Sequence, residues 1–222
     1  MIFGTFDIKK ISKIANKVSE KFLLQVEGAT CSGKSSFVSD AYTVLKRKGI
    51  NVMIIEEAAT KVLIENNTLL KQLITYPTKS DQWKKFKIEL QQKVLSHQIE
   101  GLERFAENGT YTLAIMDRGG ASTAYHTIPL VSGKDKILIE GICREIGKMS
   151  SQIFLLSPLG FLDRSSPRYQ RTLEEIKVEY KGIKHYLNRW RLNYLGIASV
   201  DRTARVKIGT VHILALLNDI KR

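Results

Sequence analysis

The residues with the clearest chemical signature lie in one short stretch that contains two glycines. It reads Gly28-Ala29-Thr30-Cys31-Ser32-Gly33-Lys34-Ser35-Ser36, and its first eight residues fit the pattern G-x-x-x-x-G-K-[ST]. In such a loop, successive backbone N–H groups and the N-terminus of the following helix surround phosphate oxygens. Lys34 is then expected to reach the β- and γ-phosphates, and the Ser35 hydroxyl to bind Mg²⁺. The stretch therefore predicts a nucleoside triphosphate site, with Cys31 as a small loop residue rather than a nucleophile.

Two adjacent carboxylates, Glu56 and Glu57, follow the apolar run 51–55, which is typical of a strand buried on both faces. In an open α/β sheet, ligands collect beyond the carboxyl ends of the strands, so these carboxylates are expected to face the site. One of them could accept the proton of a hydroxyl that attacks the γ-phosphoryl group, or orient that hydroxyl. The alternative is that the pair stabilises the N-terminus of a helix over 58–65 through its dipole, and one glutamate could do each.

A second charged pair, Asp117 and Arg118, follows the apolar run 112–116. An aspartate at this place in a triphosphate-binding protein lies near Mg²⁺, and an arginine beside it suits a phosphate or another substrate anion. The alternative is a strand-terminal turn with a surface ion pair. The sequence has no second acidic residue directly after Asp117 and no later Asn-Lys-x-Asp. These features disfavour an ATP-hydrolysing motor and a guanine-specific switch protein.

Three arginines, Arg164, Arg168 and Arg171, lie between an apolar run at 152–156 and a predicted helix start at Thr172. Thr172 and Glu175 have the spacing of a capping box, which places the arginines before the helix. The segment 160–172 is predicted to be a lid whose guanidinium groups close over the phosphates and stabilise charge in the transition state. The alternative is a solvated basic loop.

The elements that must position these residues follow from hydrophobic spacing. Short apolar runs predict strands at 22–26, 51–55, 112–116, 152–156 and 197–200. Helical spacing predicts helices over 36–48, 81–107, 135–148, 172–194 and 206–220. Ser80 is the expected N-cap of the longest helix, and Asn108-Gly109 its left-handed stop. An amphipathic helix within 1–21 is expected to precede a single α/β domain over 22–222.

Composition places the chain among globular proteins. Its 222 residues, 43% of them apolar, contain no run long enough to span a membrane, so no membrane partner is expected. The two cysteines, Cys31 and Cys143, form neither a metal nor a disulfide pattern, which favours a reducing, cytoplasmic compartment. A mitochondrial presequence is disfavoured by Asp7, Glu20 and the lack of arginine near the N-terminus.

The formal net charge of +13 is unevenly spread, since residues 161–222 carry 13 basic and 6 acidic side chains. This excess suits either a solvated basic surface around an anionic nucleotide or a nucleic-acid footprint. No run of five basic residues and no repeat of aromatic and basic residues strengthens the second interpretation.

The loop, Glu56-Glu57-Ala58-Ala59, Asp117-Arg118-Gly119 and the arginine-bearing segment together resemble the nucleoside and nucleotide kinase group of P-loop proteins. The pattern is most similar to the thymidylate-kinase-like and ribosylnicotinamide-kinase-like branch. In that branch an E-A-A-R segment follows the second strand, whereas this chain has Thr60 and Lys61 where the arginine is expected. The resemblance implies a P-loop kinase domain over 22–222, with a five-stranded parallel sheet in the order 2-3-1-4-5, helices on both faces and a lid.

The leading hypothesis is an ATP- and Mg²⁺-dependent phosphotransferase acting on a nucleoside, a nucleotide or a related small acceptor. Its catalytic residues would be Lys34, Glu56 or Glu57, Asp117, Arg118 and the arginines of the predicted lid, with Mg²⁺ near Ser35 and Asp117. One alternative places the acceptor hydroxyl on a nucleic acid, at a modified base or a strand end. Another is a nucleotide sensor that binds ATP without transferring its phosphate. The sequence does not choose the acceptor, and it leaves a homodimer open.

Overall fold

Five parallel strands form a sheet in the computed structural model, which describes residues 3, 6–57, 59, 62, 80–159, 172–198 and 201–220. The strands are β1 (Phe22–Gly28), β2 (Val52–Ile55), β3 (Leu113–Asp117), β4 (Gln152–Leu156) and β5 (Leu195–Ile197). Their order across the sheet is β2-β3-β1-β4-β5, and every neighbouring pair is parallel. The predicted α/β class and strand order are confirmed.

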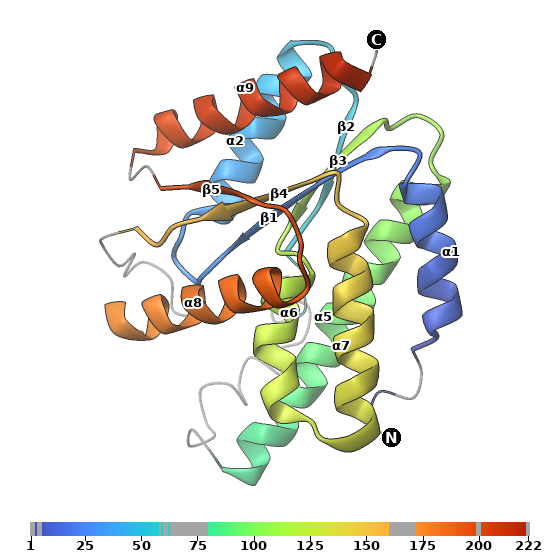
Figure 1. Ribbon diagram of the computed structural model, residues 1–222, viewed down its shortest axis with the longest axis vertical. Coiled ribbons are helices and arrows are strands. Elements are labelled where there is room, and N and C mark those ends of the chain that lie inside the picture. The colour runs from blue at the N-terminus through green and yellow to red at the C-terminus, as the bar shows by residue number, and fades with distance from the viewer. Residues whose placement is uncertain are drawn as a thin grey trace.

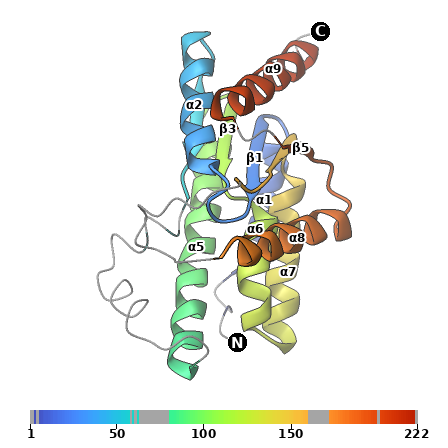
Figure 2. The same ribbon diagram turned by 90° about the vertical axis from the view of Figure 1, so that its left-hand side faces the viewer.

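Helices cover both faces of this sheet (Figures 1 and 2). They are α1 (Ile8–Val18), α2 (Lys34–Arg47), α5 (Asp81–Glu107), α6 (Gly120–Thr127), α7 (Gly133–Lys148), α8 (Leu173–Arg189) and α9 (Arg202–Ile220), with a short 3-10 helix at Ile128–Leu130. Helices α2 and α9 pack on one face, and α1, α5, α6, α7 and α8 lie on the other. In both views the loop that follows β1 lies beside α8.

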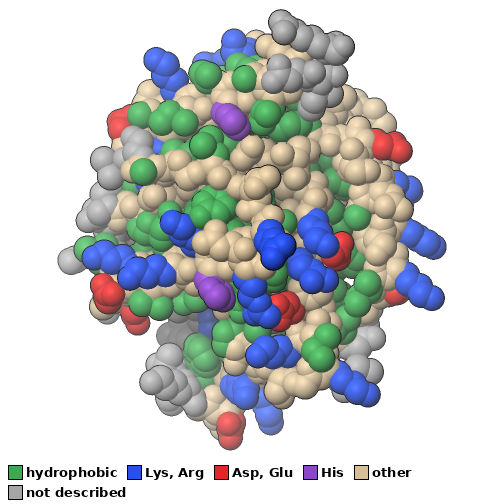
Figure 3. All heavy atoms as spheres, in the orientation of Figure 1, with side chains coloured by type: hydrophobic (Ala, Val, Ile, Leu, Met, Phe, Trp, Pro, Cys, Tyr) green, Lys and Arg blue, Asp and Glu red, His purple; other side chains and the backbone are tan. Residues whose placement is uncertain are grey.

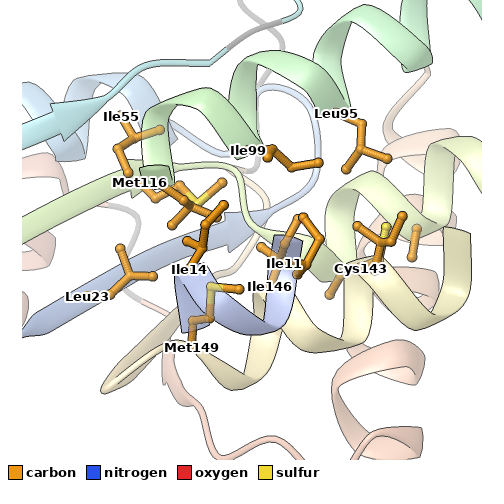
Figure 4. Packing of buried hydrophobic residues seen from close by; sticks show 14 of the residues in the cluster. Ile11, Ile14, Leu23, Ile55, Leu95, Ile99, Met116, Cys143, Ile146 and Met149 are labelled. Atoms are coloured by element: carbon orange, nitrogen blue, oxygen red, sulfur yellow. The ribbon is translucent and has the colours of Figure 1, made fainter. Parts of the chain in front are cut away.

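The larger core lies on the second of these faces, and α1 closes it. Ile11 and Ile14 of α1 insert between α5 and α7, near Ile99 and Ile146 (Figure 4). The lysines of α1 are exposed on its outer side. The amphipathic pattern before the first strand therefore forms the predicted helix, and its apolar stripe faces the core.

Strand β1 brings polar groups into this core. Successive side chains of a strand point to opposite faces of the sheet. Leu24 and Val26 pack against α2 and α9, whereas Gln25 and Glu27 point toward α6 and α7. Every residue of β1 is buried, so these two polar side chains must find partners inside the protein.

Helix α5 has the predicted start and end, but the predicted left-handed stop is wrong. Ser80 caps its N-terminus by accepting the N–H of Trp83. At the other end Asn108 is extended, and its side-chain oxygen accepts the N–H groups of Thr110 and Tyr111. An asparagine side chain can offer the backbone this alternative to a left-handed turn.

Other boundaries also differ from the sequence-based expectation. Helix α9 begins at Arg202 rather than at 206, and α2 and α7 each begin two residues earlier than predicted. Helix α8 ends at Arg189, earlier than the predicted 194, because Arg191 takes the left-handed conformation and the N–H of Leu192 returns to the carbonyl of Leu187. Strand β5 begins two residues earlier than predicted, because Leu195 pairs with Phe154 of β4. Helix α6 was not predicted as a separate element.

The surface in Figure 3 carries charges of both signs, with Lys and Arg side chains frequent across its middle and acidic side chains among them. On α7 and α8, Arg189 pairs with Glu140 at 2.8 Å and Lys148 pairs with Glu145 at 3.0 Å. The positive charge of these helices is therefore partly neutralised. Within the described residues, the helices are too short or too polar to cross a bilayer.

Candidate functional site

The loop that contains the two glycines joins the end of β1 to the first turn of α2, as predicted. Gly28 has a φ of 149°, and a Cβ there would lie 2.8 Å from the carbonyl oxygen of Leu156. Gly33 has a φ of 77° and is the N-cap of α2, and Cys31 is also left-handed. Glycine adopts such conformations at no steric cost. The first glycine is thus required by the close approach of β4, and the second by the turn into the helix.

Lys34 begins α2 and is buried, with 7% of its surface exposed. Its ammonium donates a hydrogen bond to the carbonyl oxygen of Ala29, 2.8 Å away. Burial lowers the pKa of Lys34, and the Arg118 guanidinium lowers it further, while the carboxylates of Asp117 and Glu57 act in the opposite direction. The ammonium of Lys34 therefore lies across the loop, against the carbonyl of Ala29.

Asp117 is the last residue of β3, and its carboxyl lies next to Ser35 in the first turn of α2. Its carboxyl is buried, and burial raises its pKa, while the Lys34 ammonium and a hydrogen bond from the Ser35 hydroxyl oppose that rise. Its Oδ1 has no hydrogen-bond partner among the described atoms. The fold thus brings together Ser35 and Asp117, the two residues that the sequence predicts to lie near Mg²⁺.

Arg118 and Glu57 form an ion pair next to this aspartate, with 3.0 Å between Nη2 and Oε1. Burial alone would lower the pKa of Arg118, but the surrounding carboxylates, Glu57 foremost, raise it above its ordinary value. Arg118 has a φ of 75°, and its carbonyl oxygen accepts a hydrogen bond from Gln98 of α5. Glu56 is exposed, so of the two predicted carboxylates Glu57 is the one that Arg118 holds at the site.

Sequence reasoning missed Glu27, which is fully buried at the end of β1. Its carboxylate accepts the N–H of Ala121 at 2.9 Å and both the N–H and the hydroxyl of Ser122. Burial raises the pKa of Glu27, and these hydrogen bonds oppose the rise. Because anions stabilise helix N-termini, Glu27 holds the first turn of α6 against β1. The available signal was an acidic residue inside an apolar strand.

Gln25, two residues before Glu27 on β1, has a similar role. Its amide donates to the carbonyl of Ile146 and accepts the N–H of Gly120 at 3.3 Å. A Cβ on Gly119 would lie 1.9 Å from the Gln25 side-chain oxygen, so only glycine fits there. Gln25 and Glu27 together fix the turn that carries Asp117 and Arg118.

Sequence reasoning also missed Glu179 of α8, a fully buried carboxylate beside the loop. Its Oε1 accepts the hydroxyl of Thr30 at 3.2 Å and lies 3.0 Å from Nε2 of His126 on α6. The charge of Glu179 also acts on Lys34 and Arg118. One carboxylate thus connects the loop to the two helices α6 and α8.

Close packing between α6 and α8 brings Glu179 to this position. A Cβ on Gly182, three residues after Glu179, would lie 2.3 Å from the ring of Tyr125. The ring of Tyr125 in turn packs edge-on against that of His126, with 5.1 Å between centroids. A larger residue at 182 would therefore displace either the Tyr125 ring or α8.

A third residue outside the predicted set is Arg205, on the first turns of α9. Its guanidinium donates to the carbonyl oxygens of Ser32 in the loop and of Ser157 after β4. Sequence reasoning gave Arg205 no role, since it lies just before the helix predicted over 206–220. Its positive charge could have been noticed, but nothing in the local pattern relates it to the loop.

The predicted lid arginines, Arg164, Arg168 and Arg171, lie outside the described residues. The helix start that follows them is confirmed, because Thr172 and Glu175 form a complete capping box. The role of the three arginines stays a prediction.

Several buried polar atoms at the site have no hydrogen-bond partner among the described atoms. They are Ser32 Oγ, Asp117 Oδ1 and Arg118 Nε, and two others lie elsewhere, on Ser150 and Trp190. Buried polar groups are normally satisfied, so this grouping fits a site for a polar ligand. Among the described residues, no three His, Cys, Asp or Glu side chains gather as a metal-binding group.

No family model matches the sequence, and no curated protein matches it. The solved structures that resemble the fold include two at 14% sequence identity. NadR protein in complex with NR has a TM-score of 0.64 and is matched over 88% of this chain and 52% of its own. NadR protein in complex with NAD and AMP-PNP has a TM-score of 0.60, over 88% and 50%. The chain spans about half the length of these proteins, and the likeness shows that it shares their fold.

Proposed function

We propose that this chain is an ATP-dependent phosphotransferase that acts on a nucleoside, a nucleotide or a related small acceptor. The observation that carries the proposal is the meeting of Lys34 on the loop with Asp117 and the Arg118–Glu57 pair at the ends of β3 and β2. Phosphoryl transfer is catalysed mainly by positioning and by stabilising charge, and these groups suit both tasks. The similar structures that hold NR or AMP-PNP support a small acceptor and an adenine nucleotide donor.

In this proposal the chain's own groups have separate tasks. The loop amides and Lys34 bind the β- and γ-phosphates, and the ammonium exchanges the Ala29 carbonyl for phosphate oxygens. Arg118 stays charged in its buried position and offsets the negative charge that develops during transfer. Glu57, held by Arg118, orients the acceptor hydroxyl and receives its proton.

The residues at the loop also fit a Mg²⁺ ion. Ser35 and Asp117 would hold it, and the unpartnered Oδ1 of Asp117 is an oxygen of the kind that this ion prefers. Because no group of three His, Cys, Asp or Glu side chains gathers in the described residues, phosphate oxygens and water would complete the coordination. When bound, the ion neutralises charge on the β- and γ-phosphates.

The test is transfer of the labelled γ-phosphate of ATP, with Mg²⁺, to pooled acceptors. One pool holds nucleosides, nucleoside monophosphates and ribosylnicotinamide, and another holds single- and double-stranded DNA and RNA. Label in a small molecule supports the proposal and identifies the acceptor class. Label in a polymer would move the acceptor to nucleic acid. Bound ATP with no label in either pool would favour a nucleotide sensor.

A loop variant shows whether any observed transfer belongs to this site. We expect Lys34→Ala to lower the rate at least about 100-fold, because it removes a charge that stabilises the transition state. Lys48→Ala is the control, since Lys48 is exposed at the far end of the same helix and should leave the rate unchanged. Equal rates for the wild type and Lys34→Ala would overturn the assignment of the site.

A further inference from the structure

Arg205 of α9 connects the loop to the end of β4. Only 3% of its surface is exposed. Its Nη1 lies 2.6 Å from the carbonyl oxygen of Ser32, and its Nη2 lies 2.8 Å from that of Ser157. Because the guanidinium is planar and rigid, these two bonds hold the loop, the end of β4 and the start of α9 in one arrangement.

The bond to Ser32 determines the direction of the next amide. In a planar trans peptide, the carbonyl and the following N–H point in opposite directions. Arg205 holds the Ser32 carbonyl on its own side, so the N–H of Gly33 points away from Arg205. Inward N–H groups are what a phosphate-binding loop requires. Both neighbours of Ser32, Cys31 and Gly33, are left-handed. Without the bond from Arg205, the peptide group between Ser32 and Gly33 could therefore take other orientations, because glycine allows them.

The charge of Arg205 also lies close to the loop. Its Nη1 would be 3.9 Å from a Cβ placed on Gly33. Burial lowers the pKa of the guanidinium, but an arginine keeps its proton in proteins. A buried cation attracts a nearby anion more strongly than an exposed one, because water screens it less.

We propose that Arg205 is a positioning residue of the triphosphate site, which aims the Gly33 amide at the phosphates and adds its charge behind the loop. The inference rests on the proposed function only in assuming that the loop binds ATP. It assigns to α9 a direct part in nucleotide affinity.

The experiment compares the dissociation constant of ATP with Mg²⁺, measured by calorimetry, in four proteins. Arg205→Met keeps the apolar stem, and we expect it to weaken binding about tenfold or more. Arg205→Lys should weaken binding less, because an ammonium keeps the positive charge but lacks the two NH₂ groups that reach both carbonyls. Arg202→Ala is the matched control, since Arg202 ties α9 to Asp40 of α2 at 2.6 and 2.7 Å without touching the loop. It should bind ATP as the wild type does.

Amide hydrogen exchange in the ligand-free proteins separates an effect on the loop from a loosened helix. In Arg205→Met we expect faster exchange within 29–36 and unchanged exchange within α9 beyond 206. Equal ATP affinity in Arg205→Met and the wild type would overturn the inference. So would equal weakening in Arg205→Met and Arg202→Ala, with α9 exchanging faster in both. If Arg205→Met does not fold, wild-type affinity in Arg205→Lys overturns it. A wild type that binds no ATP would instead refute the proposed function.

Discussion

The loop is held on two sides by opposite chemistry. On the α8 side, the carboxylate of Glu179 receives the hydroxyl of Thr30 and pairs with the ring of His126. On the α9 side, the guanidinium of Arg205 donates to two backbone carbonyls. The first contact needs particular side chains at three positions, whereas the second needs one side chain and the backbone. Substitutions should therefore disturb the α8 side at more positions than the α9 side.

The contact of Glu179 and the ion pair of Arg202 also differ in how deeply they lie. Glu179 is fully buried and acts on Lys34 and Arg118 within the site. Helix α9 carries, besides Arg205, the exposed pair of Arg202 with Asp40. Breaking a buried charge contact costs several times more than breaking an exposed one. Three experiments, from the largest expected effect to the smallest, test this difference.

Truncation of Glu179 should have the largest effect on stability. Glu179→Ala leaves the Thr30 hydroxyl and the His126 ring without this acceptor in a partly buried place, so we expect a loss of about 3 kcal/mol in the free energy of unfolding. Urea denaturation measures it. Lys181→Ala, an exposed truncation on the same helix, is the control and should change stability by less than about 0.5 kcal/mol. Similar losses in both variants would show that Glu179 does not hold the loop.

Removal of the Thr30 hydroxyl should have an intermediate effect. Thr30→Val keeps the shape and loses one hydrogen bond to a charged acceptor, at a cost of about 1 to 2 kcal/mol in unfolding free energy. Ser32→Ala is the counterpart on the α9 side. It leaves the backbone bond to Arg205 intact and removes a buried hydroxyl that has no partner among the described atoms, so it should be neutral or stabilising. Thermal unfolding that ranks Ser32→Ala below Thr30→Val would contradict the comparison.

Loss of the exposed ion pair between Arg202 of α9 and Asp40 of α2 should have the smallest effect on stability, and this effect should depend on pH. The hydrogen bond from Arg202 holds the pKa of Asp40 below its usual value of 3.8. The ionised Asp40 therefore adds stability above that value, and this contribution is lost as the pH falls through the lower pKa of the folded protein. Asp40→Asn should be slightly less stable than the wild type at pH of about 7, and the gap should close in acid. A gap that widens on acidification would refute this sign.

The sequence predicted much of the fold because the relevant signals are local. Apolar runs located the five strands, although β5 shares only Ile197 with its predicted run among the described residues, and short-range patterns located the caps at Ser80 and Thr172. The glycine-lysine pattern placed the loop between β1 and α2. Each of these structures depends on residues within a few positions of one another.

The rest of the candidate site depends on contacts between distant residues. Thr30 and Glu179 are 149 positions apart, and Ser32 and Arg205 are 173 apart. No local spacing relates such pairs, because only the packing of α8 and α9 on the sheet brings them together. For the same reason the sequence could not decide between Glu56 and Glu57, since the difference lies in which of them the Arg118 side chain reaches.

The close crossing at Gly182 suggests how distant relatives of this chain could be recognised. The reach of Glu179 depends on a size limit three residues later, where a methyl group would collide with Tyr125. The contacts of Glu179 at the loop thus correspond to two short sequence patterns, Glu-x-x-Gly on α8 and Tyr-His on α6. A substitution at either place would need a compensating change at the other. A joint search for the two patterns should therefore find chains that hold the loop in this way, even where little overall identity remains.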